Sequence, residues 1–215
     1  MLAIRKALPQ DLPHFYDICL KTGDNGKDAS DFFYDPWLLG QYYAAPYLFF
    51  PGALCFAAEE GGIPQGYIIA VPDTAAFDVW MENVWLPPLR LRYPSPLPEE
   101  RARSPYEAKI AALLHLPHPS RPAPPWRAGY PAHLHIDLLP RIQGKGCGRR
   151  LVESLCAALR ENAVPGIHLG VSRLNTGAVA FYGRMGFSRI EEDSGGYTMA
   201  LKLRDAPPRK QQGDA

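Results

Sequence analysis

The chain has 215 residues, of which 47% are hydrophobic and 21% charged, so it can bury the core of one sizeable domain. Its 23 basic and 22 acidic residues nearly balance, which excludes a strong electrostatic attraction to nucleic acid or to an anionic membrane surface. No apolar run approaches the ~20 residues of a membrane span, no signal peptide is visible, and the four cysteines have no paired metal-ligand spacing. These features predict a soluble cytoplasmic protein with reduced thiols.

The first 72 residues alternate strands and helices. Apolar spacing predicts a strand, a helix that starts near Asp11, an aromatic-rich helix after Pro36, and two strands joined by a hairpin at Gly61-Gly62. In order, these elements fall at residues 2–8, 12–20, 37–48, 53–60 and 65–72.

Residues 73–131 break this pattern. Most of the 23 prolines lie between Pro87 and Pro140, so regular helix or sheet cannot run through the whole stretch. One helix is predicted over roughly 104–114, where Ser104 can cap the first turn and a proline suits the first helical position. The tryptophans of this stretch indicate that it packs against the rest of the chain. We interpret it as a Pro- and Trp-rich insertion over the active-site face.

Order returns at residue 132 with a strand whose side chains alternate between apolar and polar: Leu134, Ile136 and Leu138 on one face, and His133, His135 and Asp137 on the other. After a glycine-rich turn, the pattern predicts an amphipathic helix, a strand, a helix that Asn175 can cap, and two closing strands. These fall at residues 149–162, 166–172, 175–185, 187–193 and 196–203. The chain is therefore predicted to form a single α/β domain over 1–205, followed by a disordered tail at 206–215.

Three phosphate-binding interpretations are considered for the glycine-rich turn, RIQGKGCGRRL at residues 141–151. It fails as a P-loop because no Ser or Thr follows its Gly-Lys pair in the required place. It fails as a dinucleotide turn because its third glycine comes one residue early, at Gly148. Backbone N–H groups at a helix N-terminus can still hold a pyrophosphate, because small residues let the chain approach the anion and nearby cations attract it. An ordinary tight turn is the alternative.

The spacing around this turn resembles the GNAT superfamily of acyl-CoA-dependent N-acyltransferases. The family's pyrophosphate motif, Gln/Arg-x-x-Gly-x-Gly/Ala, fits residues 143–148, which follow a strand and open a helix as in the family. A second block, Asn and then Ala-x-x-Phe-Tyr-x-x-x-Gly-Phe, fits Asn175 and residues 178–187. The two blocks cover roughly residues 132–203. The resemblance implies a mixed central sheet of about six or seven strands, flanked by helices and splayed at the acyl-CoA site.

Three further stretches look like the acetyltransferase-like C-terminal domain of O-GlcNAcase: residues 38–74, 85–96 and 133–139. The glycoside hydrolase domain of that relative is absent here, so hydrolase activity is not implied. In the relative the glycine motif appears degraded, whereas here it is intact. The likeness therefore allows two functions, an active acetyltransferase or a non-catalytic acyl-CoA-binding or protein-interaction module.

By resemblance, acetyl-CoA is the acyl donor, and its binding residues lie along the last third of the chain. The backbone of Leu138 and Leu139 is expected to pair with the pantetheine arm and to offer an N–H to the thioester oxygen. The pyrophosphate and the arm are expected to contact Gln143, Gly144, Lys145, Gly146, Cys147, Gly148, Arg149, Asn175 and Phe181. Asn175 has a second possible role as a plain helix cap.

Tyr182 occupies the position from which the family protonates the leaving thiolate, and a phenol of pKa ~10 suits that role. Asp137 is expected to be the general base, with His135 as its competitor. No metal is expected, because the rest of the chain offers no obvious further ligands.

The acceptor is expected to be a small-molecule or peptide amine, with no nucleic-acid or membrane partner. Four residues of the insertion are candidates for shaping its pocket: Glu82, Trp85, Tyr93 and Trp126. Packing the insertion against the rest of the chain is the alternative role of each, and the one that we favour.

Overall fold

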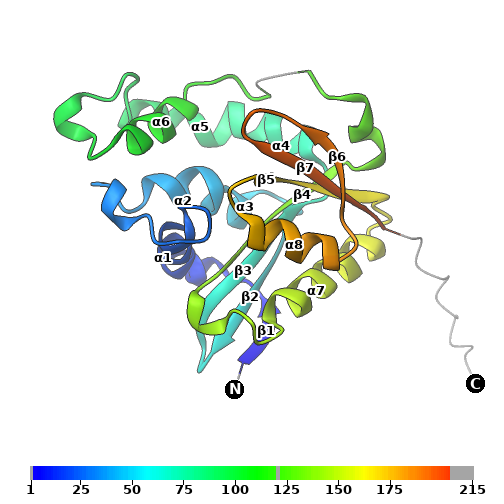
Figure 1. The fold of residues 1–215 in the computed structure, drawn as a ribbon. Coiled ribbons are helices and arrows are strands. Elements are labelled where there is room, and N and C mark those ends of the chain that lie inside the picture. Colours follow the sequence, from blue (N-terminus) through cyan, green and yellow to red (C-terminus); the bar gives the residue numbers. More distant parts are fainter. Residues whose placement is uncertain (1, 120–121, 204–215) are drawn as a thin grey trace, which may run out of the picture.

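The structure, a computed structural model that describes residues 2–119 and 122–203, is built on one mixed sheet of seven strands in the order β1-β2-β3-β4-β5-β7-β6 (Figure 1). All neighbouring strands are antiparallel except β4 and β5, which are parallel. The mixed α/β sheet flanked by helices that the sequence predicts is therefore confirmed, while the expected tail lies outside the described residues. The strands are β1 (Leu2–Lys6), β2 (Leu54–Glu60), β3 (Ile63–Val71), β4 (Ala132–Leu138), β5 (Gly166–Ser172), β6 (Ser188–Glu192) and β7 (Gly196–Lys202).

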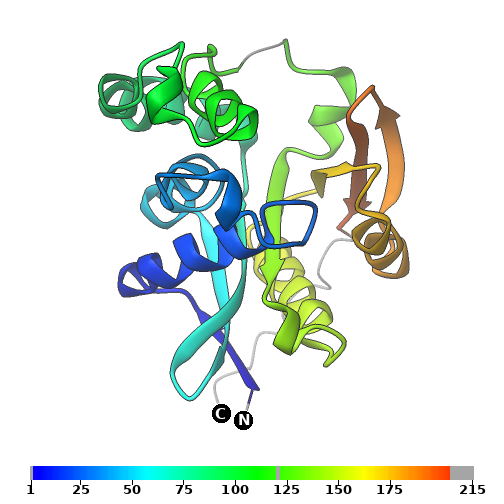
Figure 2. The ribbon, with the colours of Figure 1, turned by 60° about the vertical axis from the view of Figure 1, so that its left-hand side comes forward.

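The sheet opens between its two parallel strands. β4 and β5 pair only through Ala132 with Ile167 and His133 with His168, and β4 then continues to Leu138 against β3 alone. Figure 2 shows the two halves of the sheet separating at this point. The unpaired edge of β4 is the splayed region that the resemblance implies.

Alternating side chains on the central strands build two cores, one on each face of the sheet. Tyr67 and Ile69 of β3 pack on the side of α1 (Leu12–Thr22), whereas Ile68 and Ala70 pack on the side of α7 (Cys147–Glu161). The predicted amphipathic stripe of α7 is buried on this second face and comprises Leu151, Val152, Leu155, Cys156 and Leu159. α8 (Thr176–Arg184) lies beside α7 (Figure 1).

The aromatic-rich helix predicted after Pro36 is two short helices, α2 (Leu38–Tyr43) and α3 (Ala45–Phe49). Pro46 lies at the start of α3, where its missing N–H costs nothing, but it could not sit inside a continuous helix. The chain bends at Ala44, which has φ −128° and ψ −55°.

The insertion is more regular than its prolines predict, so the expectation of one helix in this stretch was wrong. Besides the predicted helix, now α6 (Pro105–Leu113), it contains α4 (Thr74–Trp80), a π-helical turn (Met81–Trp85) and α5 (Leu86–Arg92). Two prolines at the start of α5 directly follow the π-helical turn, where the hydrogen-bond pattern of the helix changes and two missing N–H groups are accommodated. Inward-facing residues of all three helices complete the core on the α1 side: Phe77, Met81, Leu86, Leu89, Ile110, Ala111 and Leu114.

A rigid two-residue turn follows α1. Asp24 and Lys27 exchange backbone hydrogen bonds of 3.0 and 2.9 Å around Asn25 and Gly26, whose φ angles are 51° and 90°. Asn-Gly is the pair that such a left-handed turn favours. Its tip reaches across the gap of the sheet, because a Cβ on Gly26 would lie 3.7 Å from Nδ2 of Asn175 in the loop before α8.

Candidate active site

The glycine-rich turn forms an open cradle at the start of α7. Gly144 and Gly146 have φ angles of +70° and +79°, which only glycine adopts without strain, and no described atom lies within 4 Å of where a Cβ would be. Gly146 is the N-cap of α7, and no side chain in the described part of the chain caps the helix. The first N–H groups of α7 are therefore free to bind an anion from solvent.

The next glycine is required for a different reason. A Cβ on Gly148 would lie 3.2 Å from both Leu138 of β4 and Phe181 of α8, so this residue lets α7 start close against both elements. Cys147 is 1% exposed, so its side chain belongs to the core and only its backbone can line the cradle.

The polar side chains of the cradle differ in how they are held. The Gln143 amide donates to the Leu138 carbonyl at 2.8 Å and ties the turn to the end of β4. Lys145 and Arg149 are exposed, and Arg149 is paired with Glu153 at 2.7 Å. Both cations are placed to attract an anion that approaches from solvent.

The two leucines at the end of β4 differ in their free backbone groups, which corrects one expectation. Leu139 donates its N–H to the carbonyl of Gln65 at 2.9 Å, so it has no N–H to offer a thioester. In an antiparallel ladder, residues bonded to one neighbour alternate with residues that face away from it. The N–H groups of Leu138 and Ile136 therefore face the gap between β4 and β5.

Asp137 lies on the α1 face of β4 beside Tyr67, whose hydroxyl donates to its Oδ2 at 2.6 Å. Tyr67 is fully buried and stacks on Phe15 with ring centroids 4.5 Å apart, so the donor is rigidly placed. Burial raises the pKa of Asp137, while the hydrogen bond from the Tyr67 hydroxyl opposes the rise. A carboxylate with a raised pKa is a stronger base than an ordinary aspartate.

The two histidines of β4 are not equivalent. Thr74 donates to the Pro131 carbonyl at 2.6 Å, so its oxygen accepts from Nδ1 of His133, and Nε2 of His133 then accepts from the Tyr47 hydroxyl at 2.6 Å. Both ring nitrogens of His133 are used, so it cannot act as a base. His135 lies edge-on to the rings of Tyr43 and Tyr47. Burial lowers the pKa of His135 to about 4, which makes it a weak proton acceptor at neutral pH.

Tyr182 is 7% exposed, and its ring packs beside Phe181 and Phe187. Its hydroxyl makes no hydrogen bond with any residue that the structure describes. Burial raises the pKa of Tyr182, and the charge of Asp137 raises it further, so the phenol stays protonated at neutral pH.

Asn175 is the N-cap that the sequence predicts, since its Oδ1 accepts from the N–H of Ala178 at 3.1 Å. Its Nδ2 is left to face the turn at Gly26, on the far side of the gap.

None of the four insertion residues expected to shape an acceptor pocket lines a cavity with the residues of β4. Glu82 is bound by Arg90 at 2.7 Å, and Trp126 packs on His168. Trp85 stacks on Phe49, and the buried Tyr93 donates to Asp35. These contacts fit the packing role that the sequence allows for all four residues, and Tyr93 also lines a cavity beside α5; their part in an acceptor pocket stays a prediction.

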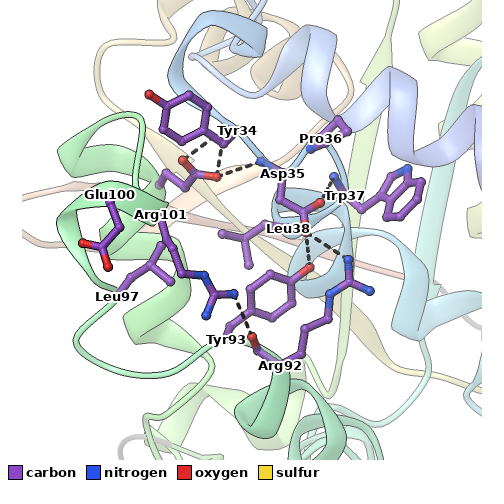
Figure 3. Close-up of a pocket in the computed structure, with 11 residues that line it drawn as sticks. Tyr34, Asp35, Pro36, Trp37, Leu38, Arg92, Tyr93, Leu97, Glu100 and Arg101 are labelled. Atoms are coloured by element: carbon purple, nitrogen blue, oxygen red, sulfur yellow. Dashed lines mark hydrogen bonds and ion pairs between the residues drawn. The ribbon is translucent and has the colours of Figure 1, made fainter.

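Two cavities open beside the insertion. One, of about 470 Å³, lies between the segment before α2 and the end of α5 (Figure 3). Polar groups of its wall bind one another: Asp35 accepts hydrogen bonds from the Tyr93 hydroxyl at 2.7 Å and from Arg92 at 3.1 Å. Arg101 donates to the Arg92 carbonyl at 3.3 Å. These hydrogen bonds hold two segments of the chain together around the cavity.

The second cavity, of about 480 Å³, lies between the turn after α1 and helix α6. Tyr43 in its wall is the residue whose ring contacts His135 at 5.7 Å. The sequence analysis missed this wall, although α6 carries a readable signal: its lining residues Tyr106, Lys109, Ile110 and Leu113 follow the i, i+3, i+4, i+7 spacing of one helical face.

Among residues 2–119 and 122–203, no group of three or more His, Cys, Asp or Glu side chains could hold a metal ion. Within the same residues, no helix has the length and apolar character needed to cross a membrane.

Comparison with known proteins points to one family. A model of the Acetyltransferase (GNAT) family matches residues 111–187, which include β4, the cradle and α8. The solved structure of SsHAT is 37% identical, with a TM-score of 0.84 over 95% of this chain and 99% of that one.

More distant structures share the fold. The ribosomal-protein-S18-alanine N-acetyltransferase from Escherichia coli is 18% identical, with a TM-score of 0.53 over 97% of this chain and 98% of that one. The PaiA N-acetyltransferase from Thermoplasma acidophilum, solved in complex with coenzyme A, is 13% identical, with a TM-score of 0.53 over 94% of this chain and 99% of that one.

Proposed function

The chain belongs to the GNAT acetyltransferase family, and from that premise we propose that it transfers the acetyl group of acetyl-CoA to an acceptor amine in the gap between β4 and β5. The observation that carries the proposal is the open glycine cradle at the uncapped start of α7, next to a strand whose free edge leads to Asp137. A pyrophosphate fits this cradle, because Gly144 and Gly146 leave its surface clear of side chains.

Each group near the gap has a separate task in this proposal. The N–H groups at the start of α7 hold the pyrophosphate, with Lys145 and Arg149 drawing the anion in. The pantetheine arm runs along the free edge of β4, where the N–H of Leu138 takes the role that Leu139 cannot fill.

Proton transfer falls to two side chains on either side of the gap. Asp137 accepts the proton that the amine loses, directly or through a water, because its raised pKa makes it a better base than an exposed aspartate. Tyr182 is the group that protonates the departing thiolate. Its raised pKa keeps the phenol protonated until the thiolate forms, and its hydroxyl makes no hydrogen bond in the described chain. His135 is the weaker candidate base because its pKa is lowered to about 4.

A non-catalytic acyl-CoA-binding or protein-interaction module is the less favoured alternative. It was suggested by the likeness to the O-GlcNAcase domain, a relation that remains a proposal. The open glycine cradle, with a candidate base and a candidate acid near the same strand edge, supports transfer over this alternative. The cytoplasm remains the proposed location, and the four free cysteines are in the state that a reducing compartment maintains.

Calorimetric titration with acetyl-CoA tests the proposal most directly. A Gly146→Trp variant should abolish binding by filling the cradle. Gly52→Trp is the matched control, because Gly52 also has a positive φ, +86°, and no described atom within 4 Å of its Cβ position, yet lies in the turn before β2. Binding by the wild type and Gly52→Trp but not by Gly146→Trp is expected. Equal binding by all three, or no binding by the wild type, would exclude the cradle as the cofactor site.

A further inference from the structure

The cavity beside α6 is separated from the polar face of β4 by one layer of side chains. Tyr43 in its wall contacts His135, which lies two residues from Asp137 on β4. Gly23, also in its wall, follows Thr22, whose hydroxyl interacts with the Asp137 carboxylate. The cavity therefore lies behind Tyr43 and Gly23 as seen from β4, on the face of the sheet opposite the α7 core.

One wall of the cavity is apolar, and hydrogen bonds and ring contacts hold it in place. Tyr106 donates its hydroxyl to the carbonyl of Gly23 at 2.8 Å, which ties α6 to the turn after α1. Its ring lies edge-on to Phe32, with ring centroids 6.1 Å apart. Ile110 and Leu113 continue the same wall one turn further along α6. Such a surface binds an aromatic ring or a branched aliphatic group better than a polar chain.

Two opposite charges border the cavity from different walls. Asp24 comes from the turn after α1, next to Gly23, and Lys109 comes from the lining face of α6. They do not form an ion pair with each other, and Lys109 makes no hydrogen bond or ion pair anywhere in the described chain. The Asp24 side chain accepts one hydrogen bond, from Asn25 at 3.1 Å. The cavity thus offers a carboxylate from the turn after α1 and an unpaired cation from α6.

We propose that this cavity is the acceptor site and that it takes a zwitterionic amine with an apolar side group, an amino acid whose ammonium group faces Asp24 and whose carboxylate pairs with Lys109. The location rests on the proposed acetyl transfer, whereas the binding chemistry rests on the cavity itself. Size supports the assignment, because about 480 Å³ is within the range of small-molecule sites. A free amine without a carboxylate would leave Lys109 unpaired. A small amino acid would leave the aromatic side chains of the wall exposed to water.

Binding of matched amines, measured by calorimetry without acetyl-CoA, tests the chemistry apart from the reaction. The probes are L-phenylalanine, phenethylamine, which lacks only the carboxylate, and L-alanine, which lacks only the ring. The variants are Lys109→Met, which keeps the apolar stem, Leu113→Trp, which fills the cavity, and Lys21→Met as a surface control on α1. Transfer to each amine is then measured with acetyl-CoA present.

The wild type and Lys21→Met should bind phenylalanine about tenfold more tightly than either other amine. Lys109→Met should lose the preference over phenethylamine, and Leu113→Trp should lose binding of phenylalanine. Equal or tighter binding of phenethylamine by the wild type, an unchanged preference in Lys109→Met, or no binding of any probe would overturn the inference. Binding with this pattern but without transfer would leave the site standing and refute the proposed function. Efficient transfer to amines without a carboxylate would support the proposed function and refute the inferred acceptor chemistry.

Discussion

Gly66 of β3 lies directly opposite Leu138 of β4, and its replacement by alanine tests how closely the sheet positions the gap. A Cβ at this position would lie 2.8 Å from the backbone oxygen of Asp137 and 3.1 Å from Cα of Leu138, and it would overlap the Leu138 side chain. Two of these three atoms belong to the backbone, so a change of rotamer cannot relieve the contact. β4 itself must move.

The size of the effect follows from these distances. Ordinary contact with a Cβ begins at 3.4 Å, so the backbone of β4 must shift by about half an ångström. Overpacking of this kind costs about 1–3 kcal/mol of unfolding free energy. Because a catalytic group displaced by about 1 Å can lose 100-fold in rate, a shift half as large should slow acetyl transfer on the order of tenfold.

Urea unfolding of the wild type, Gly66→Ala and Gly183→Ala measures the stability term. Gly183 lies in α8 with no described atom within 4 Å of its Cβ position, so its replacement should stabilise the helix by up to about 1 kcal/mol. Rates of acetyl transfer with saturating acetyl-CoA measure the effect of the displaced strand on catalysis. If Gly66→Ala is as stable as the wild type, β4 is not held at this contact and the reasoning fails.

Three other perturbations separate structural from chemical roles. Burial lowers the pKa of His135 from 6.5 to about 4, so the folded protein disfavours protonation of this side chain. The free energy of unfolding is therefore unaffected by this group above about pH 6.5 and decreases as the pH falls toward 4. Unfolding measured across this window should show a loss of up to about 3 kcal/mol that His135→Phe reduces; identical pH profiles would contradict the argument. Glu107→Gln should cost about 2 kcal/mol in urea unfolding, because the buried carboxylate accepts backbone N–H bonds from Tyr34, Asp35 and Arg103 at 2.7–3.1 Å. The exposed Glu100→Gln should cost nothing, and equal costs would refute this role. Tyr182→Phe should lower the rate of transfer about 100-fold with little change in stability, and an unchanged rate would remove Tyr182 from the chemistry.

The elements that local sequence predicts are those fixed by neighbours along the chain. The alternation of β4, the apolar stripe of α7, the cap at Asn175 and the cradle glycines each depend on a few consecutive residues, and the structure contains all of them. Local sequence does not predict the rest of the helical insertion, because prolines indicate a break in a helix. In the structure the two prolines of α5 directly follow a π-helical turn, and the helix continues through them.

Leu139 shows the limit of local inference. Whether its N–H faces the gap depends on its pairing with Gln65, which lies far away in the chain. The residue pattern of β4 alone does not reveal which N–H groups face β3 and which face the gap. His133 is similar, because Tyr47 and Thr74 decide that its two nitrogens are used.

This difference between local and distant contacts also divides the two sides of the proposed reaction. The acyl-donor side is built from one continuous part of the chain, from β4 to α8, and the family model matches this part. The acceptor side is assembled from the turn after α1, from α2 and from α6, which only tertiary packing brings together. Substitutions on α6 such as Lys109→Met should therefore change which amine binds while leaving the affinity for acetyl-CoA as it is, because no residue of α6 touches the cradle. A parallel loss of acetyl-CoA binding in that variant would show that the two sides are coupled and that the acceptor wall cannot change independently of the donor site.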